Sequence, residues 1–335
     1  MSGQPTIHDV AREAAVSIAT VSNTMNRPGR VAALTRQRVL EAVDLLGYVP
    51  HSIAAHRART RHERIGVIAP FTSYASFSAR IQGMFEVLGA DHIEAIIYDH
   101  PSASRSPSPR LAALPVAAEL DGLVIMGVPV DIGLAERLLA RELPTVLVDS
   151  RHPQFTSVVL DEAYGARMAA QHLVGRGFER FVYITEGQRS NDYISQGQRR
   201  AAGFLRALAE AGVEQEFVDI LTARAGDAHA GHTAAAAIAQ IAGEGRVGVL
   251  CGHDTLAAGV LAGLRRRCVA VPERVGVMGW DGGEIVEALG LTTVHQPLAE
   301  SGRLGAQRLV ARMRDASEPV ERIVLRPTLF EGVTT

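Results

Sequence analysis

Short apolar runs alternate with longer amphipathic segments over most of the chain, and this alternation is the feature that most restricts the fold. Runs typical of buried strands lie at 65–71, 93–98, 120–126, 144–149, 180–185, 246–250 and 274–280. Helical spacing of apolar residues occurs between many of them, for example at 76–90, 163–176, 197–212, 229–242 and 254–265. This alternation predicts parallel sheets with helices on both faces. Because about 270 residues exceed what a single core usually organises, we expect two Rossmann-like lobes.

The first 49 residues carry three short helical patterns and no strand pattern. Thr6 can cap the first helix, and Ser17 can cap the second after a tight turn through 14–16. In the second helix Val21 faces inward, together with Ala19 or Met25. The third helix is expected to begin at the cap Thr35, with its apolar face formed by Val39, Leu40, Val43 and Leu46. This pattern predicts an all-α helix-turn-helix head ahead of the α/β core.

Charge is distributed unevenly along the chain. All 34 basic residues are arginine, so Schiff-base enzymes, pyridoxal-phosphate enzymes and the lysine-dependent phosphate loop are excluded. Residues 1–64 hold nine arginines against five acidic residues, a net charge of +4, whereas the remaining 25 arginines and 31 acidic residues give −6. A basic head on an acidic body is typical of a polyanion-binding module joined to a second functional unit.

Other signals in the sequence are weak. No basic leader precedes an apolar run and no membrane-length apolar stretch occurs, so we expect a cytoplasmic protein without membrane contact. Cys251 and Cys268 are too few and too far apart for a disulfide framework or a metal site. The GxGxxG match at 243–248 precedes a strand instead of following one, which is wrong for a dinucleotide site. We therefore expect no catalytic residue, metal or cofactor.

Several long motifs resemble the LacI/GalR family of bacterial transcription regulators. The head reads TIHDVAREAAVSIATVSNTMN from residue 6 and VAALTRQRVLEAVDLLGYVP from residue 31, followed by RIGVIAP. Further matches begin at residue 160 (LDEAYGARMAAQHLVGRG), 199 (RRAAGFLRAL), 251 (CGHDTLAAGVLAGL), 271 (VPERVGVMGWDGGEI) and 291 (LTTVHQP). The resemblance extends over the whole chain and is specific.

The resemblance implies three parts: a helix-turn-helix DNA-binding domain at 1–49, a hinge at 50–63, and an effector-binding and dimerisation core at 64–335. Such a core is similar to periplasmic sugar-binding proteins, whose chain crosses between the lobes three times. Here we expect the crossings near residues 160, 291 and 319. The first lobe would then contain about 64–160 and 292–318, and the second about 161–291 and 319–335.

The polar outer face of the second helix suits a major groove, where short hydroxyl and amide side chains meet phosphates and base edges. Together with the family pattern, this predicts DNA contacts from Thr6, Ser17, Ile18, Ala19, Thr20, Ser22, Asn23, Asn26, His51, Ala54 and Arg57. Four positions depart from the pattern: Ala15 stands for a glycine, Asn23 for an arginine, His51 for an asparagine and Arg57 for a leucine that wedges into the minor groove. Whether Arg57 replaces that wedge stays open, because an arginine can enter a narrow minor groove but cannot part a base step.

Ligands of parallel sheets bind beyond the carboxyl ends of the strands, so the cleft between the lobes is the expected pocket. Strand ends and family positions together predict a site formed by Tyr74, Phe77, Asp149, Arg200, Asp254, Trp280 and Asp281. Carboxylates, a guanidinium and an aromatic face suit a carbohydrate. Structural roles compete with this interpretation: Asp254 can cap a helix, Trp280 can be a core residue and Asp149 can cap a loop.

The leading hypothesis is a homodimeric repressor that binds a pseudo-palindromic double-stranded operator and is released by a sugar or sugar phosphate. One alternative keeps the DNA binding but uses a purine-like corepressor that stacks on Trp280. Another is a cytosolic solute-binding protein whose head is an interaction module. Steep salt dependence would separate DNA binding from the last alternative.

Overall fold

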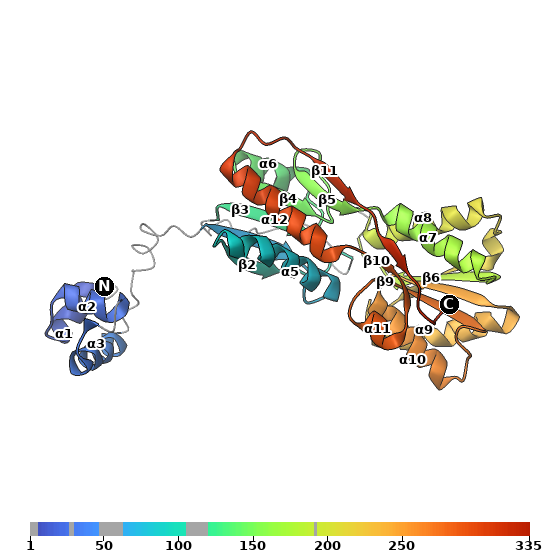
Figure 1. Cartoon of the computed structure of the whole chain (residues 1–335), viewed down its shortest axis with the longest axis horizontal. Coiled ribbons are helices and arrows are strands. Elements are labelled where there is room, and N and C mark those ends of the chain that lie inside the picture. The colour runs from blue at the N-terminus through green and yellow to red at the C-terminus, as the bar shows by residue number, and fades with distance from the viewer. Residues whose placement is uncertain (1–5, 27–29, 47–62, 105–119, 191–192) are drawn as a thin grey trace. The chain divides into compact units, whose positions relative to one another are not determined.

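The computed structural model describes all residues except 1–5, 27–29, 47–62, 105–119 and 191–192 (Figure 1). The chain divides into two compact units, Met1–His62 and Glu63–Thr335, which we describe separately. In the described part of both units, none of the helices combines the length and apolar character needed to span a bilayer.

The first unit is a three-helix head with a small apolar core. Its helices are α1 (Ile7–Glu13), α2 (Ile18–Asn26) and α3 (Ala33–Leu46). The buried core consists of Val10, Ala11, Ala14, Val21, Val39 and Ala42, with Ile7, Val16, Val43 and Leu46 packed around it. All three helices contribute to this core, so the predicted helix-turn-helix head is present.

Some local predictions for the head hold and others fail. The hydroxyl of Ser17 accepts a hydrogen bond from the amide of Thr20 at 3.1 Å, as expected for a cap of α2. Thr35 is not a cap, because α3 already begins at Ala33. Leu40 was expected inside but is 45% exposed. In α2 the inward position goes to Thr24 instead of Ala19, because its hydroxyl can donate to the carbonyl of Thr20 at 2.9 Å.

The second unit contains two six-stranded sheets, and each forms the centre of one lobe. The sheet of the first lobe has the order β11-β5-β4-β3-β1-β2, and all its neighbouring strands are parallel. Its strands are β1 (Arg64–Ala69), β2 (Glu94–Asp99), β3 (Gly122–Met126), β4 (Thr145–Val148), β5 (Thr156–Leu160) and β11 (Arg322–Leu325). The sheet of the second lobe has the order β12-β10-β9-β8-β6-β7, with only β12 antiparallel. Its strands are β6 (Arg180–Glu186), β7 (Val218–Ala223), β8 (Val247–Cys251), β9 (Val275–Asp281), β10 (Thr292–His295) and β12 (Thr328–Phe330).

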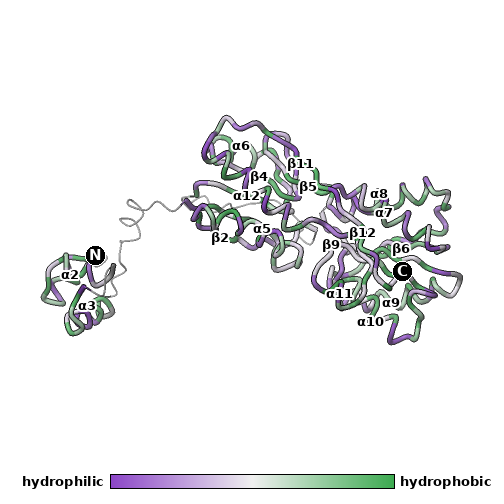
Figure 2. The backbone as a smooth tube through the Cα atoms, viewed as in Figure 1, coloured by the Kyte–Doolittle hydropathy of each residue, from purple (hydrophilic) through white to green (hydrophobic). Residues whose placement is uncertain are grey.

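Helices cover both faces of each sheet, as the alternation of patterns predicts. In the first lobe α5 (Ala75–Ala90) and α12 (Leu298–Arg314) pack on one face and α6 (Ile132–Ala140) on the other. In the second lobe α9 (Ala228–Ile241) and α10 (Asp254–Arg266) pack on one face, while α7 (Glu162–Gly175) and α8 (Gln196–Glu210) pack on the other. Figure 2 shows apolar residues along the central strands, which are buried on both faces. A short helix, α11 (Ile285–Leu289), precedes β10.

The chain crosses between the lobes three times, but two crossings come later than predicted. The first lies between β5 and α7, close to the expected residue 160. The predicted crossings at 291 and 319 are too early, because 292–295 form β10 of the second sheet and 322–325 form β11 of the first. Both strands are only four residues long, and β11 is largely exposed, so neither forms the long apolar run by which the other strands are recognised.

Ala15, in the turn between α1 and α2, has a positive φ of 51°. Glycine adopts this left-handed conformation without the steric cost that a Cβ imposes.

We expect Ala15→Gly to stabilise the head by up to about 1 kcal/mol, because removing the Cβ relieves this strain. Hydrogen exchange of the amides of α1–α3 in the full chain should slow, while exchange in the second unit should not change. Ala14→Gly is the matched control, because Ala14 is buried with a φ of −77° and the same substitution there should accelerate exchange. Equal acceleration in both variants would contradict the strain at Ala15.

Candidate functional site

A cavity of about 350 Å³ lies between the two lobes of the second unit. Many of its lining residues follow the carboxyl ends of parallel strands: Gly127 after β3, Asp149 after β4, Glu186 at the end of β6, His253 after β8 and Asp281 at the end of β9. Both sheets thus direct their strand ends toward one space, which is the expected place for a ligand.

The first lobe contributes a carboxylate that is fixed by a buried arginine. Asp149 accepts a hydrogen bond from the guanidinium of Arg80 at 3.0 Å, and the Arg80 side chain is only 2% exposed. The Arg80 guanidinium also lies over the ring of Phe77, 5.0 Å from its centre. Asp149 has a φ of 55°, a strained conformation for a residue with a Cβ. The carboxylate is therefore held in one orientation at the cavity wall.

The second lobe contributes a buried ion pair. The Arg200 guanidinium donates to both carboxylate oxygens of Glu162, from Nε at 2.6 Å and from one terminal nitrogen at 3.2 Å. The other terminal nitrogen donates to the carbonyl of Gly252 at 2.8 Å. Burial alone would lower the pKa of Arg200, but the adjacent Glu162 carboxylate outweighs it and raises that pKa above its ordinary value. Arg200 therefore stays charged, and its side chain is fixed where it borders the cavity.

Trp280 supports Arg200 from behind and does not reach the cavity. The Arg200 guanidinium lies 4.6 Å from the centre of the Trp280 indole, which is fully buried. The side-chain amide of Gln296 is oriented with its oxygen toward Trp280 and Arg200. In this orientation the oxygen accepts hydrogen bonds from the indole N–H and from the guanidinium. The predicted ligand contact of Trp280 is therefore not supported by its position, because the core and Arg200 cover the ring.

Asp254 also has a supporting position. One of its carboxylate oxygens accepts from the amides of Gly282 and Gly283 at 2.7 and 3.0 Å, and the other accepts from the Thr293 hydroxyl at 2.7 Å. These bonds fix the turn that follows Asp281, whose own side chain lines the cavity 3.4 Å from Nδ1 of His253. Asp254 itself does not line the cavity, so its interpretation as a structural residue is favoured.

Direct hydrogen bonds join the lobes across the cavity. The Tyr74 hydroxyl of the first lobe is hydrogen-bonded to Glu186 of the second lobe and, at 2.5 Å, to Ser102. The Tyr74 ring stacks on His253 with ring centres 5.1 Å apart. The side-chain amide of Gln196 donates to the backbone carbonyl of Asp149 at 2.6 Å. The lobes are therefore in contact through polar groups that a ligand could compete for.

Several buried polar atoms that lack a hydrogen-bond partner in the described part of the chain belong to residues that line the cavity. Within the described residues, the buried atoms Nε of Arg80, Oε2 of Glu186 and Oε1 of Gln188 have no hydrogen-bond partner, and all three residues line the cavity. Because an unpaired buried polar atom is costly, such atoms favour a polar partner in the cavity, either water or a ligand. One donor and two acceptors match the dual character of hydroxyl groups.

Five of the seven residues predicted for the ligand site line the cavity, namely Tyr74, Phe77, Asp149, Arg200 and Asp281. Sequence reasoning missed Arg80, Glu186, Gln188, Gln196 and His253, which line it as well. The strand-end argument could have found Glu186 and His253. Arg80 and Gln196 lie on helices, where the sequence pattern contains no comparable signal.

The residues predicted for DNA contact lie mainly on and before α2. Ser17, Ile18, Ala19 and Asn23 are exposed, as is Thr6 before α1, while Thr20 and Ser22 are partly exposed. Asn26 is the last residue of α2. His51, Ala54 and Arg57 lie outside the described residues. Ile18, Ala19 and Asn23 lie on the exposed side of α2, which is anchored in the head by Val21 and Thr24.

Glu162→Gln should destabilise the second unit by about 3–5 kcal/mol, because it leaves the Arg200 charge buried without its counter-charge. The fluorescence of Trp280, the single tryptophan of the chain, reports this region during urea unfolding. Glu331→Gln is the control: it removes the partner of Arg176 in a pair whose side chains are 56% and 45% exposed, so its effect should stay below about 1 kcal/mol. Similar unfolding midpoints for both variants would contradict this role of Glu162.

Burial, reinforced by the nearby charge of Asp281, raises the pKa of Asp254 to about 6 from an ordinary value of 3.8. A raised carboxyl pKa means that the folded state holds its proton more tightly than the unfolded state, so stability falls as pH rises from about 4 to 6. Asp254→Asn removes this dependence. The free energy of unfolding, measured by urea titration, should change in favour of the variant: its difference from wild type should increase by roughly 2–3 kcal/mol between pH 4 and pH 7. If the difference in free energy of unfolding between Asp254→Asn and wild type does not change with pH, the raised pKa of Asp254 is refuted.

Comparison with known proteins agrees with the two-part organisation. Residues 6–51 match the family model described as bacterial regulatory proteins, lacI family, and residues 170–335 match a periplasmic binding protein-like domain. The HTH-type transcriptional repressor PurR of Erwinia tasmaniensis is 30% identical over 97% of this chain and 95% of the relative. GalR of Escherichia coli K12 is 29% identical over 97% of this chain and 94% of that protein.

Solved structures are similar as well. A LacI-family transcriptional regulator from Silicibacter pomeroyi has a TM-score of 0.74 at 26% identity, covering 98% of this chain and 99% of its own. Its similarity extends over the head and both lobes. Together with the helix-turn-helix head and the two-lobed α/β core, these findings show that the chain belongs to the lacI family of bacterial regulatory proteins and is a DNA-binding transcriptional regulator.

Proposed function

We propose that this regulator is a homodimeric repressor that binds a pseudo-palindromic operator through the outer face of α2. In this proposal a polyhydroxyl ligand, a sugar or sugar derivative, occupies the cavity between the lobes and releases the operator. One head reads only a half-site, so a two-fold symmetric pair is needed to bind a palindrome. The repressors and regulators that it resembles support the first part, and it acts in the cytoplasm where the chromosome lies.

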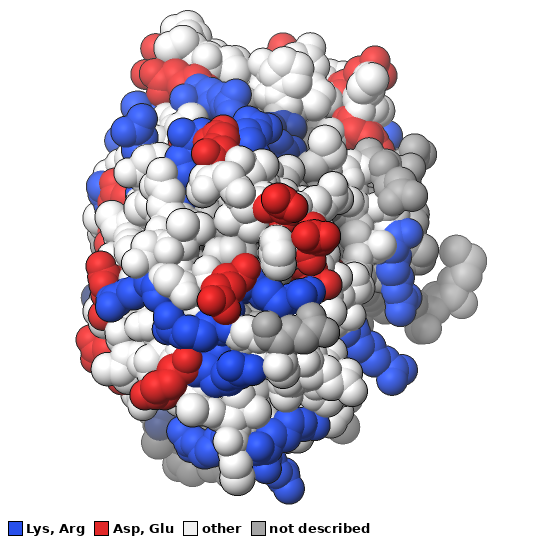
Figure 3. Space-filling model, turned by 90° about the vertical axis from the view of Figure 1, so that its right-hand side faces the viewer, with Lys and Arg blue, Asp and Glu red and all other residues white. Residues whose placement is uncertain are grey.

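The composition of the head supports DNA contact through α2. Its exposed residues Ser17, Ile18, Ala19 and Asn23 are small or uncharged, and they can approach base edges closely. Asn23 can pair with adenine, whereas a guanine contact would call for arginine. By contrast, on the end of the second lobe that Figure 3 presents, arginine and acidic side chains are interspersed. The net positive charge of the first 64 residues lies mostly in residues 50–64, so it favours the head together with the segment that follows it as the polyanion-binding part.

The unpaired donor and acceptors at the cavity are the observation that carries the ligand proposal. Arg80 Nε, Glu186 Oε2 and Gln188 Oε1 can each be satisfied by a hydroxyl group, which both donates and accepts. The carboxylates of Asp149 and Asp281 border the same cavity from opposite lobes and can accept from further hydroxyls. A purine corepressor is less favoured, because the indole of Trp280 is not accessible for stacking.

A ligand can change DNA binding only if it prefers one arrangement of the lobes. A ligand could compete with the hydrogen bonds that join the lobes across the cavity, such as Tyr74 to Glu186 and Gln196 to the Asp149 carbonyl. Replacing them with ligand contacts would shift the lobes, and a preference of about 1–3 kcal/mol for one arrangement is enough to reduce affinity for DNA five- to 150-fold.

The test measures binding of the full chain to its own upstream promoter fragment by fluorescence anisotropy at several salt concentrations. Affinity should fall steeply with rising salt, because arginine–phosphate contacts release counterions. Sugars that raise the melting temperature should weaken this binding about tenfold or more. Asp281→Ala should bind the fragment normally and no longer respond to the same sugar.

Two controls separate the parts of this proposal. Asn23→Ala should weaken operator binding while leaving the thermal response to sugar intact, because the change is confined to α2. Absence of binding by wild type at low salt would refute the DNA role, and a normal sugar response in Asp281→Ala would refute the ligand site.

A further inference from the structure

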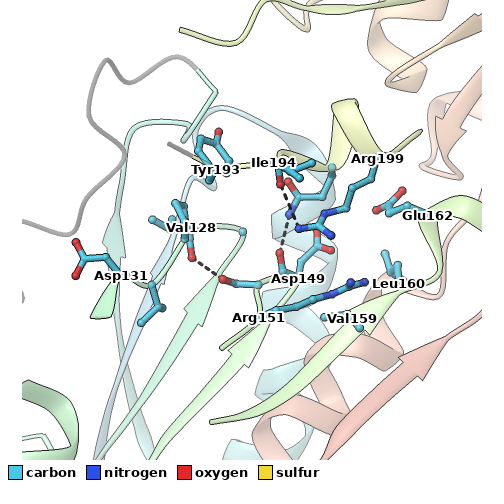
Figure 4. Close-up of a pocket in the computed structure, with 15 residues that line it drawn as sticks. Val128, Asp131, Asp149, Arg151, Val159, Leu160, Glu162, Tyr193, Ile194 and Arg199 are labelled. Atoms are coloured by element: carbon cyan, nitrogen blue, oxygen red, sulfur yellow. Dashed lines mark hydrogen bonds between the residues drawn. The ribbon is translucent and has the colours of Figure 1, made fainter. Parts of the chain in front are cut away.

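A second cavity of about 300 Å³ adjoins the first (Figure 4). Gly127, Asp149, Tyr193 and Gln196 line both cavities, so the two spaces meet at these residues. The second cavity extends toward the crossing between β5 and α7, where Leu160 and Glu162 line it. One ligand can therefore reach into both.

The acidic residues of this second cavity already have partners. Asp149 is paired with Arg80, and Glu162 is paired with Arg200. Asp131 accepts from the amide of Leu134 at 2.8 Å and so caps α6. Asp149 and Glu162 are therefore each neutralised by an arginine, whereas Asp131 keeps its charge at the N-terminus of α6.

Two arginines of the same cavity have no carboxylate partner in the described part of the chain. Arg151 follows β4 in the first lobe, and Arg199 lies in the first turn of α8 in the second lobe. Arg199 donates only to the backbone carbonyl of Ile194, at 3.3 Å. Figure 4 shows both side chains extending along the cavity, from different elements.

Arg151 is exposed at the cavity mouth, and other arginines lie near it. Partial burial lowers its pKa, and the nearby positive charges of Arg322 and Arg199 lower it further, although Asp149 and Glu162 oppose this. Positive charges that repel one another at a cavity are stabilised when an anion binds between them.

We propose that this second cavity binds the phosphate group of a phosphorylated effector, with Arg151 and Arg199 donating to its oxygens from the two lobes. The inference rests on the proposed function and refines it, since the hydroxyls of the same ligand would occupy the first cavity. Guanidinium groups present paired N–H donors that fit phosphate oxygens, and two of them can engage a group with three terminal oxygens. A phosphate held from both lobes would favour one lobe arrangement.

Thermal unfolding of the full chain with inorganic phosphate as the probe tests this inference. Sodium chloride at matched ionic strength controls for screening, and glucose 6-phosphate with glucose and ribose 5-phosphate with ribose extend the comparison. The variants are Arg151→Gln, Arg199→Gln and the control Arg206→Gln, which removes an exposed arginine two turns further along α8.

Phosphate should raise the melting temperature of wild type and Arg206→Gln above that in chloride. In Arg151→Gln and in Arg199→Gln the apparent Kd for phosphate should increase about tenfold or more, because each loses a charge-assisted pair of hydrogen bonds. Any sugar phosphate that binds wild type more tightly than its parent sugar should lose that advantage in both variants.

No phosphate-specific stabilisation of wild type, or an equal response in all three variants, would overturn the inference. Equal binding of each sugar and its phosphate ester would do so too. Because this assay contains no DNA and uses phosphate alone as the first probe, its failure would leave operator release by an uncharged sugar intact. Conversely, loss of operator binding would not alter the phosphate result.

Discussion

A single buried guanidinium organises the region where the three inter-lobe crossings meet. Arg200 joins Glu162, which follows the first crossing, to Gln296, which precedes the second. It also covers the indole of Trp280, and both that indole and Pro327 of the third crossing lie against Gly165. A charge in this environment is tolerated only with its counter-charge and a full set of acceptors. The geometry of the cleft therefore depends on this pair, and the proposed ligand site lies directly beside it.

This arrangement separates the residues that hold the site from those that can meet a ligand. Trp280 and Asp254 lie beneath the surface and fix Arg200 and the turn after Asp281. In the other lobe Arg80 has both roles, because it fixes Asp149 and also lines the cavity. Each lobe thus presents a charged group that is already held in one orientation. A ligand that contacts both groups binds most tightly when the distance between the lobes matches its own length. Differential contact of this kind is what allows a bound molecule to select one lobe arrangement.

Much of this could be predicted from the sequence, and the failures have physical causes. The long apolar runs identified the central strands, and the rule that ligands lie beyond strand ends found Asp149 and Asp281. The same rule could not show that Asp254 turns toward backbone amides or that Trp280 lies under a guanidinium, because these facts depend on contacts between distant segments. Short polar strands such as β10 lack periodicity, and the two later crossings were therefore misplaced. Arg80 and Glu162 lie on helices, and only tertiary packing reveals their pairing with site residues.

Asp149 and Asp281 have φ angles of 55° and 118°, which are conformations that glycine adopts far more easily. The two carboxylates that border the cleft from opposite sheets are therefore placed on a main chain whose strain would fall if glycine replaced them. Sensitivity to a small molecule and resistance to heat are then opposed at the same two positions. If these residues bind the effector as proposed, selection for thermal stability alone would favour glycine at both positions and would yield a more stable protein that no longer responds to its ligand.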